Sequence, residues 1–165
     1  MEITANKNIA KLKNLIGDVE IAILSTLDGE EIISRPMATS EVDDEGNIWF
    51  FTNEYSGKVG DVINEPKVNV SYSHPGRHTY VTINGYASVV HDRAKMEQLF
   101  NPTIKIFFPQ GLNDPKLTLL KVKPYQAEYW ENHSVDGMLR FMGILGSSPI
   151  ADEELHHGEH GKISL

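Results

Sequence analysis

The most constraining feature of this sequence is a pair of apolar, β-branched segments separated by an Asp-Gly dipeptide. Residues 21–27 (IAILSTL) precede Asp28 and Gly29, and residues 31–40 (EIISRPMATS) follow them. Asp-Gly between two such segments is typical of a tight antiparallel hairpin. Because Pro36 cannot donate a backbone hydrogen bond, we expect the second strand to lie at an edge or to contain a bulge.

Further segments with strand patterns follow this hairpin, and most are joined by short turns. They cover residues 48–52, 68–72, 80–90 and 117–130. Gly85, inside the third of these segments, predicts a bulge or a bend. Strands do not alternate regularly with helices, which argues against a doubly wound parallel sheet. The pattern therefore predicts a mainly β fold with small helices, in the form of an antiparallel six-stranded barrel.

Two helices are expected beside this barrel. Residues 2–16 carry apolar side chains at helical spacing and are followed by Gly17, a common helix stop. Residues 56–65 begin with Ser56, which can cap a helix, and end before a proline. The first helix is expected to cover one end or side of the sheet.

The chain reads as one barrel domain over residues 1–131, followed by a tail over residues 132–165. In the tail the apolar pattern weakens, so we expect weak structure or a short helix near Leu139 to Leu145. His156, His157 and His160 could bind a metal as an i, i+4 pair. A solvated polar tail is the simpler interpretation, and no metal site is predicted.

Composition excludes several function classes. The net charge of −8 disfavours general binding to nucleic acid or to anionic membranes, because both need a basic face. The chain has no cysteine, which rules out thiolate metal ligands and cysteine nucleophiles. Neither a signal peptide nor an apolar segment of membrane-spanning length is recognised. A cytoplasmic location is therefore the expectation.

Four polar residues between positions 35 and 58 could form a phosphate site. Arg35 lies on a strand, Thr52 ends the next strand, and Ser56 and Lys58 begin a helix. Together they offer one guanidinium, one ammonium, two hydroxyls and the N–H groups of a helix start, all of which suit a phosphate. The alternative is that Arg35 and Lys58 are solvated surface charges.

Several segments resemble the pyridoxamine 5′-phosphate oxidase-like FMN-binding split-barrel superfamily, and within it the general stress protein 26 branch. In chain order they read SRPMATS, NIWFFTNEYSGKV, PKVNVSY, YVTINGYASV, NPTIKIFFPQG, AEYW and GEHGKI. The resemblance covers nearly the whole chain. It implies a split barrel that binds FMN, or FAD, at the interface of a homodimer.

The resemblance also implies roles for individual residues. Arg35 and Lys58 would bind the flavin phosphate, with the Ser56 hydroxyl close by. The strand residues Pro36, Met37, Ala38 and Thr39 would lie along the isoalloxazine ring, and Phe51 and Thr52 match the aromatic-Thr pair of the family. Trp130 would contact the ring from the second subunit, although it could also simply plug the barrel. Trp49, Phe50 and Phe51 read more simply as core.

The sequence departs from the true vitamin B6 oxidases of this superfamily at three points. Gly57 replaces an arginine that often precedes the phosphate-binding lysine, which allows weaker phosphate binding or the larger FAD. Ser40 replaces a strand lysine near the substrate, and no R-x-H motif follows Trp130. Pyridoxamine phosphate oxidase activity is therefore not expected.

The resemblance implies a flavin-dependent redox protein of the general stress type that acts on an unidentified small molecule. Whether the chain is an enzyme stays open, since no catalytic residue can be named from the sequence. Two alternatives are a non-catalytic flavin-binding module, favoured by the missing substrate motif, and a relative that binds a deazaflavin or haem.

Overall fold

A computed structural model describes residues 2–132 and 159–165 of the chain. Its helices are α1 (Glu2–Ile16), α2 (Gly57–Asn64) and α3 (Arg93–Leu99), with short 3₁₀ turns at η1 (Pro75–Arg77), η2 (Pro102–Ile106) and η3 (Gly111–Asn113). Its strands are β1 (Ile21–Asp28), β2 (Glu31–Val42), β3 (Ile48–Asn53), β4 (Lys67–His74), β5 (Thr79–Val90), β6 (Leu117–Glu131) and β7 (Glu159–Ser164). The expected helices at 2–16 and 56–65 are thus present as α1 and α2.

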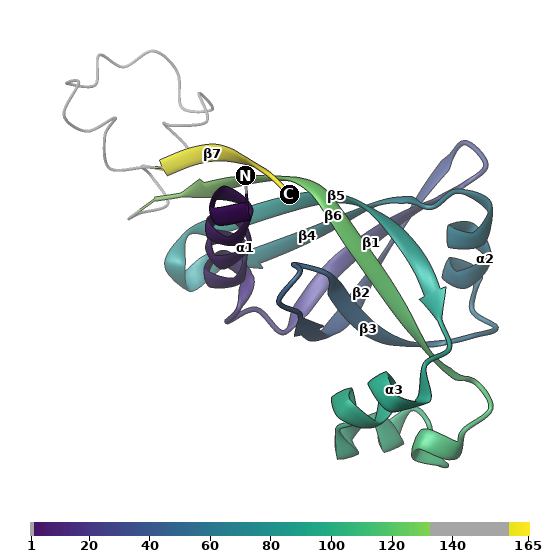
Figure 1. Cartoon of the computed structure of the whole chain (residues 1–165). Helices are drawn as coiled ribbons and strands as arrows, with labels where there is room; N and C mark the ends of the chain where they lie inside the picture. The colour runs from purple at the N-terminus through teal and green to yellow at the C-terminus, as the bar shows by residue number, and fades with distance from the viewer. Residues whose placement is uncertain (1, 133–158) are drawn as a thin grey trace, which may run out of the picture.

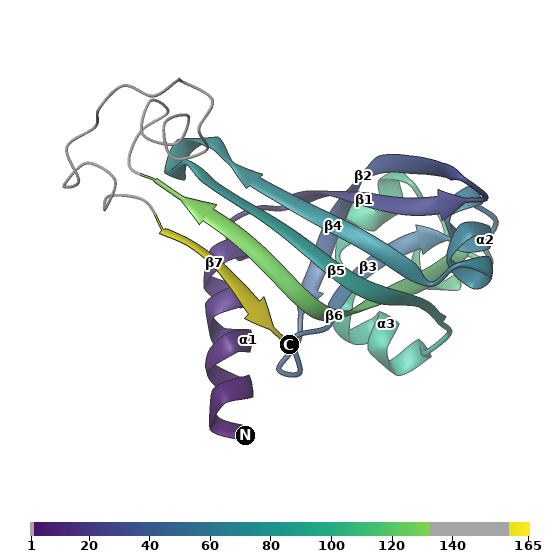
Figure 2. The same cartoon turned by 90° about the horizontal axis from the view of Figure 1, so that it is seen from above.

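The strands form one antiparallel sheet in the order β3-β2-β1-β4-β5-β6-β7, and β3 also pairs with β6. The six strands β1 to β6 therefore close into a ring, while β7 extends β6 outside it (Figure 1). This confirms the predicted six-stranded split barrel. Helices α1 and α2 lie at opposite ends of the barrel (Figure 2).

The β1–β2 hairpin turns where the sequence predicted. Asp28 pairs with Glu31, and Gly29 has a φ of 61°, a conformation that glycine adopts at no steric cost. Gly85 marks a register shift between β5 and β6, as expected. A Cβ at Gly85 would lie 2.7 Å from the Lys123 carbonyl oxygen, so only glycine permits this close backbone approach.

Strand β2 changes partners along its length, and this change opens the barrel. Residues 31–38 pair with β1, whereas pairing with β3 is confined to residues 39–42 and includes a register shift between Thr39 and Glu41. Pro36 therefore has no β3 partner, which confirms that it lies at an edge. Beyond Phe50, β3 continues alone against β6, so β2 and β3 diverge.

Apolar side chains form two clusters. The main core fills the barrel and includes Phe50, Leu24 and Tyr72. Trp49 and the partly buried Phe51 belong to a second cluster that also contains Met96 of α3. The prediction that Trp49, Phe50 and Phe51 belong to the core is confirmed.

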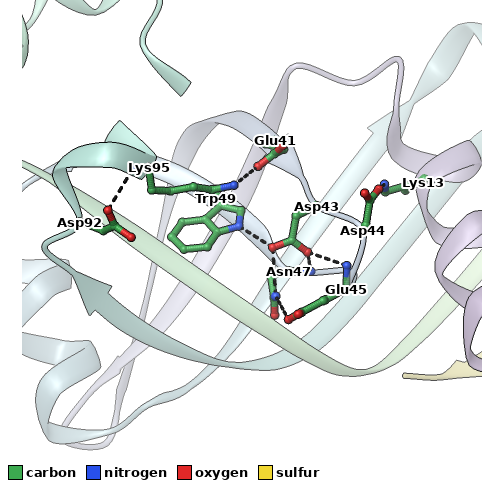
Figure 3. Close-up of polar contacts among 9 residues, drawn as sticks. All are labelled: Lys13, Glu41, Asp43, Asp44, Glu45, Asn47, Trp49, Asp92 and Lys95. Atoms are coloured by element: carbon green, nitrogen blue, oxygen red, sulfur yellow. Dashed lines mark hydrogen bonds and ion pairs between the residues drawn. The ribbon is translucent and has the colours of Figure 1, made fainter. Parts of the chain in front are cut away.

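A polar frame surrounds the buried Trp49 (Figure 3). Its Nε1 donates to Asp43 Oδ2 over 2.8 Å, and Lys95 Nζ lies 4.9 Å from a ring centroid of the indole. The Asp43 carboxylate also accepts the backbone N–H groups of Glu45 and Asn47. These bonds lower the pKa of Asp43 against the opposing effect of burial. The frame fixes the β2–β3 turn.

The prediction of a weakly structured tail is wrong for residues 159–164, which form β7 against β6. Ile163 is buried, and Gly161 lies so close to Tyr129 that a Cβ would come within 2.7 Å of its Oη. The pairing explains why so polar a segment is a strand, since β6 offers it a free edge. The expected helix near Leu139 to Leu145, like His156 and His157, lies outside the described residues. No helix in the described part of the chain could cross a membrane.

Candidate functional site

Arg35 lies where β2 separates from β3. It is opposite the buried Leu24 in the β1–β2 register, so its side chain starts from the inner face of the sheet. Nη1 donates to Thr26 Oγ1 over 2.6 Å, and Nη2 donates to Asp61 Oδ2 over 3.3 Å. Only 18% of the Arg35 side chain is exposed. The guanidinium is thus held in place and does not extend into solvent.

Lys58 faces the same region from the start of α2. Its Nζ donates to Thr52 Oγ1 over 3.0 Å and to Ser56 Oγ over 3.2 Å. Ser56 occupies the N-cap position as expected, but its side chain makes no capping hydrogen bond. The hydroxyl accepts from Lys58 instead. Thr52, Ser56 and Lys58 therefore form one hydrogen-bonded group.

The two cations are electrostatically coupled. The pKa of Lys58 is lowered from its usual 10.5, mainly by burial and in addition by the charge of Arg35. A shift of this kind means that the ammonium has lost water and gained a neighbouring positive charge. The site therefore has a positive potential that an anion would relieve. Arg35 is thus mostly buried and not a freely solvated charge, whereas Lys58 is partly exposed.

Space lies open beside this group on α2. A Cβ added at Gly57 or at Gly60 would meet no atom within 4 Å. Gly57 is exposed, so a longer side chain at this position would extend into solvent. We call Arg35, Thr52, Ser56 and Lys58 the cradle.

The strand that follows Arg35 presents alternating environments. Pro36 and Ala38 are exposed, Met37 is buried, and Thr39 is partly buried. Thr39 Oγ1 lies 2.7 Å from the hydroxyl of Tyr72, whose pKa burial raises to about 12. A flat ligand along this edge would thus contact Pro36, Ala38 and the backbone, while Thr39 is fixed by its hydrogen bond with Tyr72.

Two of the residues singled out from the sequence lie away from the cradle. The Phe51 side chain packs against the second apolar cluster and is partly buried there. Trp130 is paired with Tyr80 and His160 near the end of β6, and its indole stacks on His160 with centroids 5.1 Å apart. Thr52 of the cradle pairs with Thr118 near the start of β6, whereas Trp130 lies near the other end of that strand and pairs with Tyr80. Trp130 therefore lies away from the cradle of its own chain. It also lies on a strand face and does not plug the barrel.

Sequence reasoning missed Thr26 and Asp61. Thr26 is 2% exposed, and its Oγ1 donates to Asp61 Oδ2 over 2.7 Å while accepting from Arg35. Two signals pointed to them: Thr26 interrupts an inward apolar row, and Asp61 follows Lys58 by about one helical turn. Packing of α2 against β1 brings the two together.

Comparison with known proteins gives one family. The model of the family described as "Pyridoxamine 5′-phosphate oxidase like" matches residues 7–148. Protein bli-3 of Neurospora crassa is 26% identical over 139 residues, which cover 78% of this chain and 66% of that protein. The match thus spans slightly less than two thirds of this curated relative.

Solved structures support the same assignment. The general stress protein 26 of Bacillus anthracis superposes with a TM-score of 0.66 at 24% identity, over 73% of this chain and 92% of that one. The general stress FMN/FAD binding protein of Xanthomonas citri gives a TM-score of 0.64 at 25% identity, over 92% of this chain and 99% of that one. Fold, segment order and family match agree. This chain belongs to the pyridoxamine 5′-phosphate oxidase like family.

Proposed function

We propose that this protein binds a flavin nucleotide, with FMN as the first candidate, and that the cradle holds the phosphate. The observation that carries the proposal is the convergence of the Arg35 guanidinium and the Lys58 ammonium, with the Thr52 and Ser56 hydroxyls between strand end and helix start. This donor set suits a phosphate. The description of the Xanthomonas citri relative as an FMN/FAD binding protein supports the same ligand class.

Each cradle residue has a defined task in this proposal. Arg35 offers the N–H groups that Thr26 and Asp61 do not use, in a fixed planar array. Lys58 adds a point charge, already positioned by the two hydroxyls. Because both side chains are held before the ligand arrives, little side-chain entropy is lost on binding. The bound flavin would supply the electron chemistry, while the protein binds and orients it.

The ring would lie along Pro36 to Thr39, and its other side would be covered by a second copy of the chain. The outer face of β1 beside this segment exposes Ile21 by 53% and Ile23 by 43%. In the β1–β2 register these isoleucines lie opposite Ala38 and Pro36, so they form a continuous apolar patch. Such a patch favours a homodimer, in which Trp130 of the second copy could approach the ring.

Ile23→Lys tests the dimer. A charge in the centre of this patch should convert dimers to monomers and reduce flavin binding, as measured by light scattering coupled to size-exclusion chromatography. Ile106→Lys, at an isoleucine that is 73% exposed elsewhere, is the matched control. An unchanged dimer in Ile23→Lys, or a monomeric parent protein, would remove this part of the proposal.

We propose that the protein acts in the cytoplasm and uses its flavin to oxidise or reduce a small molecule. A non-catalytic flavin-binding module is the second candidate, because the substrate lysine position holds Ser40, which lies within the irregular β2–β3 pairing. Turnover of a nicotinamide donor by the flavin-loaded protein would favour the enzyme. Loading without turnover by any donor would favour the module.

The direct test is titration of the purified chain with FMN, FAD and riboflavin. We expect saturable quenching of flavin fluorescence, with FMN bound more tightly than riboflavin because only FMN reaches the cradle with a phosphate. If neither FMN nor FAD binds, the proposed function is wrong. Preferential binding of a deazaflavin or haem in competition with FMN would support the alternative ligand classes.

A further inference from the structure

Asp61 brings a negative charge into a site that is proposed to bind an anion. Its carboxylate is 11% exposed and lies 3.3 Å from Arg35 Nη2. It also accepts the hydroxyl proton of Thr26, which in turn accepts from Arg35. The carboxylate is therefore built into the site and shares a hydrogen-bond network with Arg35, the residue proposed to bind the phosphate.

The charge balance at the cradle follows from this placement. Among the described side chains that form the network, two cations, Arg35 and Lys58, face one carboxylate, which leaves one net positive charge. A terminal phosphate monoester carries about 1.5 to 2 negative charges at pH 7. A dinucleotide carries about the same total charge, but it is divided between two phosphates with one charge each, so only one of these charges lies in the cradle. The cradle thus matches the charge of one diester-type phosphate better than that of a monoester dianion.

We infer that Asp61 is a specificity-determining residue that limits the phosphate charge the cradle accepts, and so reduces the preference for FMN over FAD. This inference rests on the proposed flavin site and deepens it. Repulsion between the Asp61 carboxylate and a bound phosphate grows with the phosphate charge. Partial burial of Arg35 and Asp61 preserves this repulsion, because solvent screens buried charges less than exposed ones. Gly57 and Gly60 are exposed and leave room beside them, so a second phosphate there would lie in solvent, which screens its charge.

A purely structural role for Asp61 makes a different prediction. If the carboxylate only oriented Arg35, its removal would weaken the binding of FMN and of FAD to the same extent, because both ligands rely on the same guanidinium. If the charge of Asp61 limits the phosphate charge that can bind, its removal should tighten the binding of FMN more than that of FAD. The affinity for riboflavin should not change. The ratio of the FMN and FAD dissociation constants therefore separates the two roles.

The experiment compares Asp61→Asn with Thr26→Val in the full chain, titrated with riboflavin, FMN and FAD at pH 7.5. For Asp61→Asn we expect FMN to bind at least about tenfold more tightly, and FAD by about the square root of that factor, because the Coulomb energy is proportional to the phosphate charge in the cradle. Riboflavin should bind as before. Thr26→Val breaks the hydroxyl bridge but keeps the carboxylate charge, so it should not favour FMN over FAD.

Gly57→Asp provides a second variant that does not disturb the buried network, because its new side chain enters open space. The added carboxylate should weaken FMN more than FAD. Equal changes for FMN and FAD in both Asp61→Asn and Gly57→Asp would overturn the inference while leaving the flavin site intact. Absence of binding of FMN and FAD to the parent protein would instead overturn the proposed function.

Discussion

Replacing Lys58 with methionine removes one charge from the cradle and keeps a side chain of similar length. Lys58 donates hydrogen bonds to Thr52 and Ser56, and an ammonium has three N–H donors. One donor therefore remains for a phosphate. A hydrogen bond to a charged group contributes about 1.5–3 kcal/mol. We expect FMN to bind about 10- to 150-fold more weakly to Lys58→Met, since 1.4 kcal/mol is a factor of ten.

The same change should leave the stability of the ligand-free protein nearly intact. Burial and Arg35 both lower the pKa of Lys58, so its charged form is less favourable in the folded chain than in the unfolded chain. Removing it relieves this cost, while Thr52 and Ser56 lose a hydrogen-bond donor. We expect these effects to offset to within about 1 kcal/mol.

The assay is isothermal titration with FMN and riboflavin, paired with urea unfolding of the ligand-free variant. Lys123→Met, at an exposed lysine on β6, removes the same charge away from the cradle and serves as the control. The reasoning is refuted if Lys58→Met weakens riboflavin as much as FMN, or if it binds FMN as tightly as the parent protein.

Three further predictions concern pH, Gly57 and β7. The ratio of the FMN affinity to the riboflavin affinity should fall as alkaline pH deprotonates Lys58, with a midpoint below 10.5. Lys58→Arg should abolish this fall. Ionisation of the flavin ring affects both ligands equally and cancels in the ratio. In the same window the contribution of Lys58 to the ligand-free unfolding free energy should rise with pH, because the unfolded chain keeps its proton longer, as urea unfolding at several pH values would detect. Gly57→Arg should tighten FMN about tenfold in fluorescence titration, since its side chain enters open space; no gain would show that position 57 faces away from the phosphate. Gly161→Ala should destabilise the fold by about 1–3 kcal/mol, because its Cβ would lie 2.7 Å from Tyr129 Oη; a melting temperature equal to the parent's would contradict that packing.

Much of the barrel could be predicted from local patterns. The hairpin at Asp28–Gly29, the edge position of Pro36 and the bulge at Gly85 all follow from backbone chemistry that acts within a few residues. The cradle pair of Arg35 and Lys58 was also within reach, because a strand and a helix start with suitable donors stand close in the sequence. Their roles as flavin ligands remain a proposal.

Long-range contacts decided the rest. Asp61 faces Arg35 only because α2 packs on β1, which brings its carboxylate to the buried Thr26 hydroxyl. Residues 159–164 form a strand only because β6 has a free edge that a polar segment can pair with. The separation of Trp130 from the cradle depends on the register of β3 and β6, because only the first part of β6 lies beside Thr52. By itself the sequence determined strands, turns and the types of ligand-binding groups, since these depend on neighbouring residues. Tertiary structure decided which charged residues lie next to each other, because the order of strand pairing and the packing of helices bring together residues that no local pattern connects.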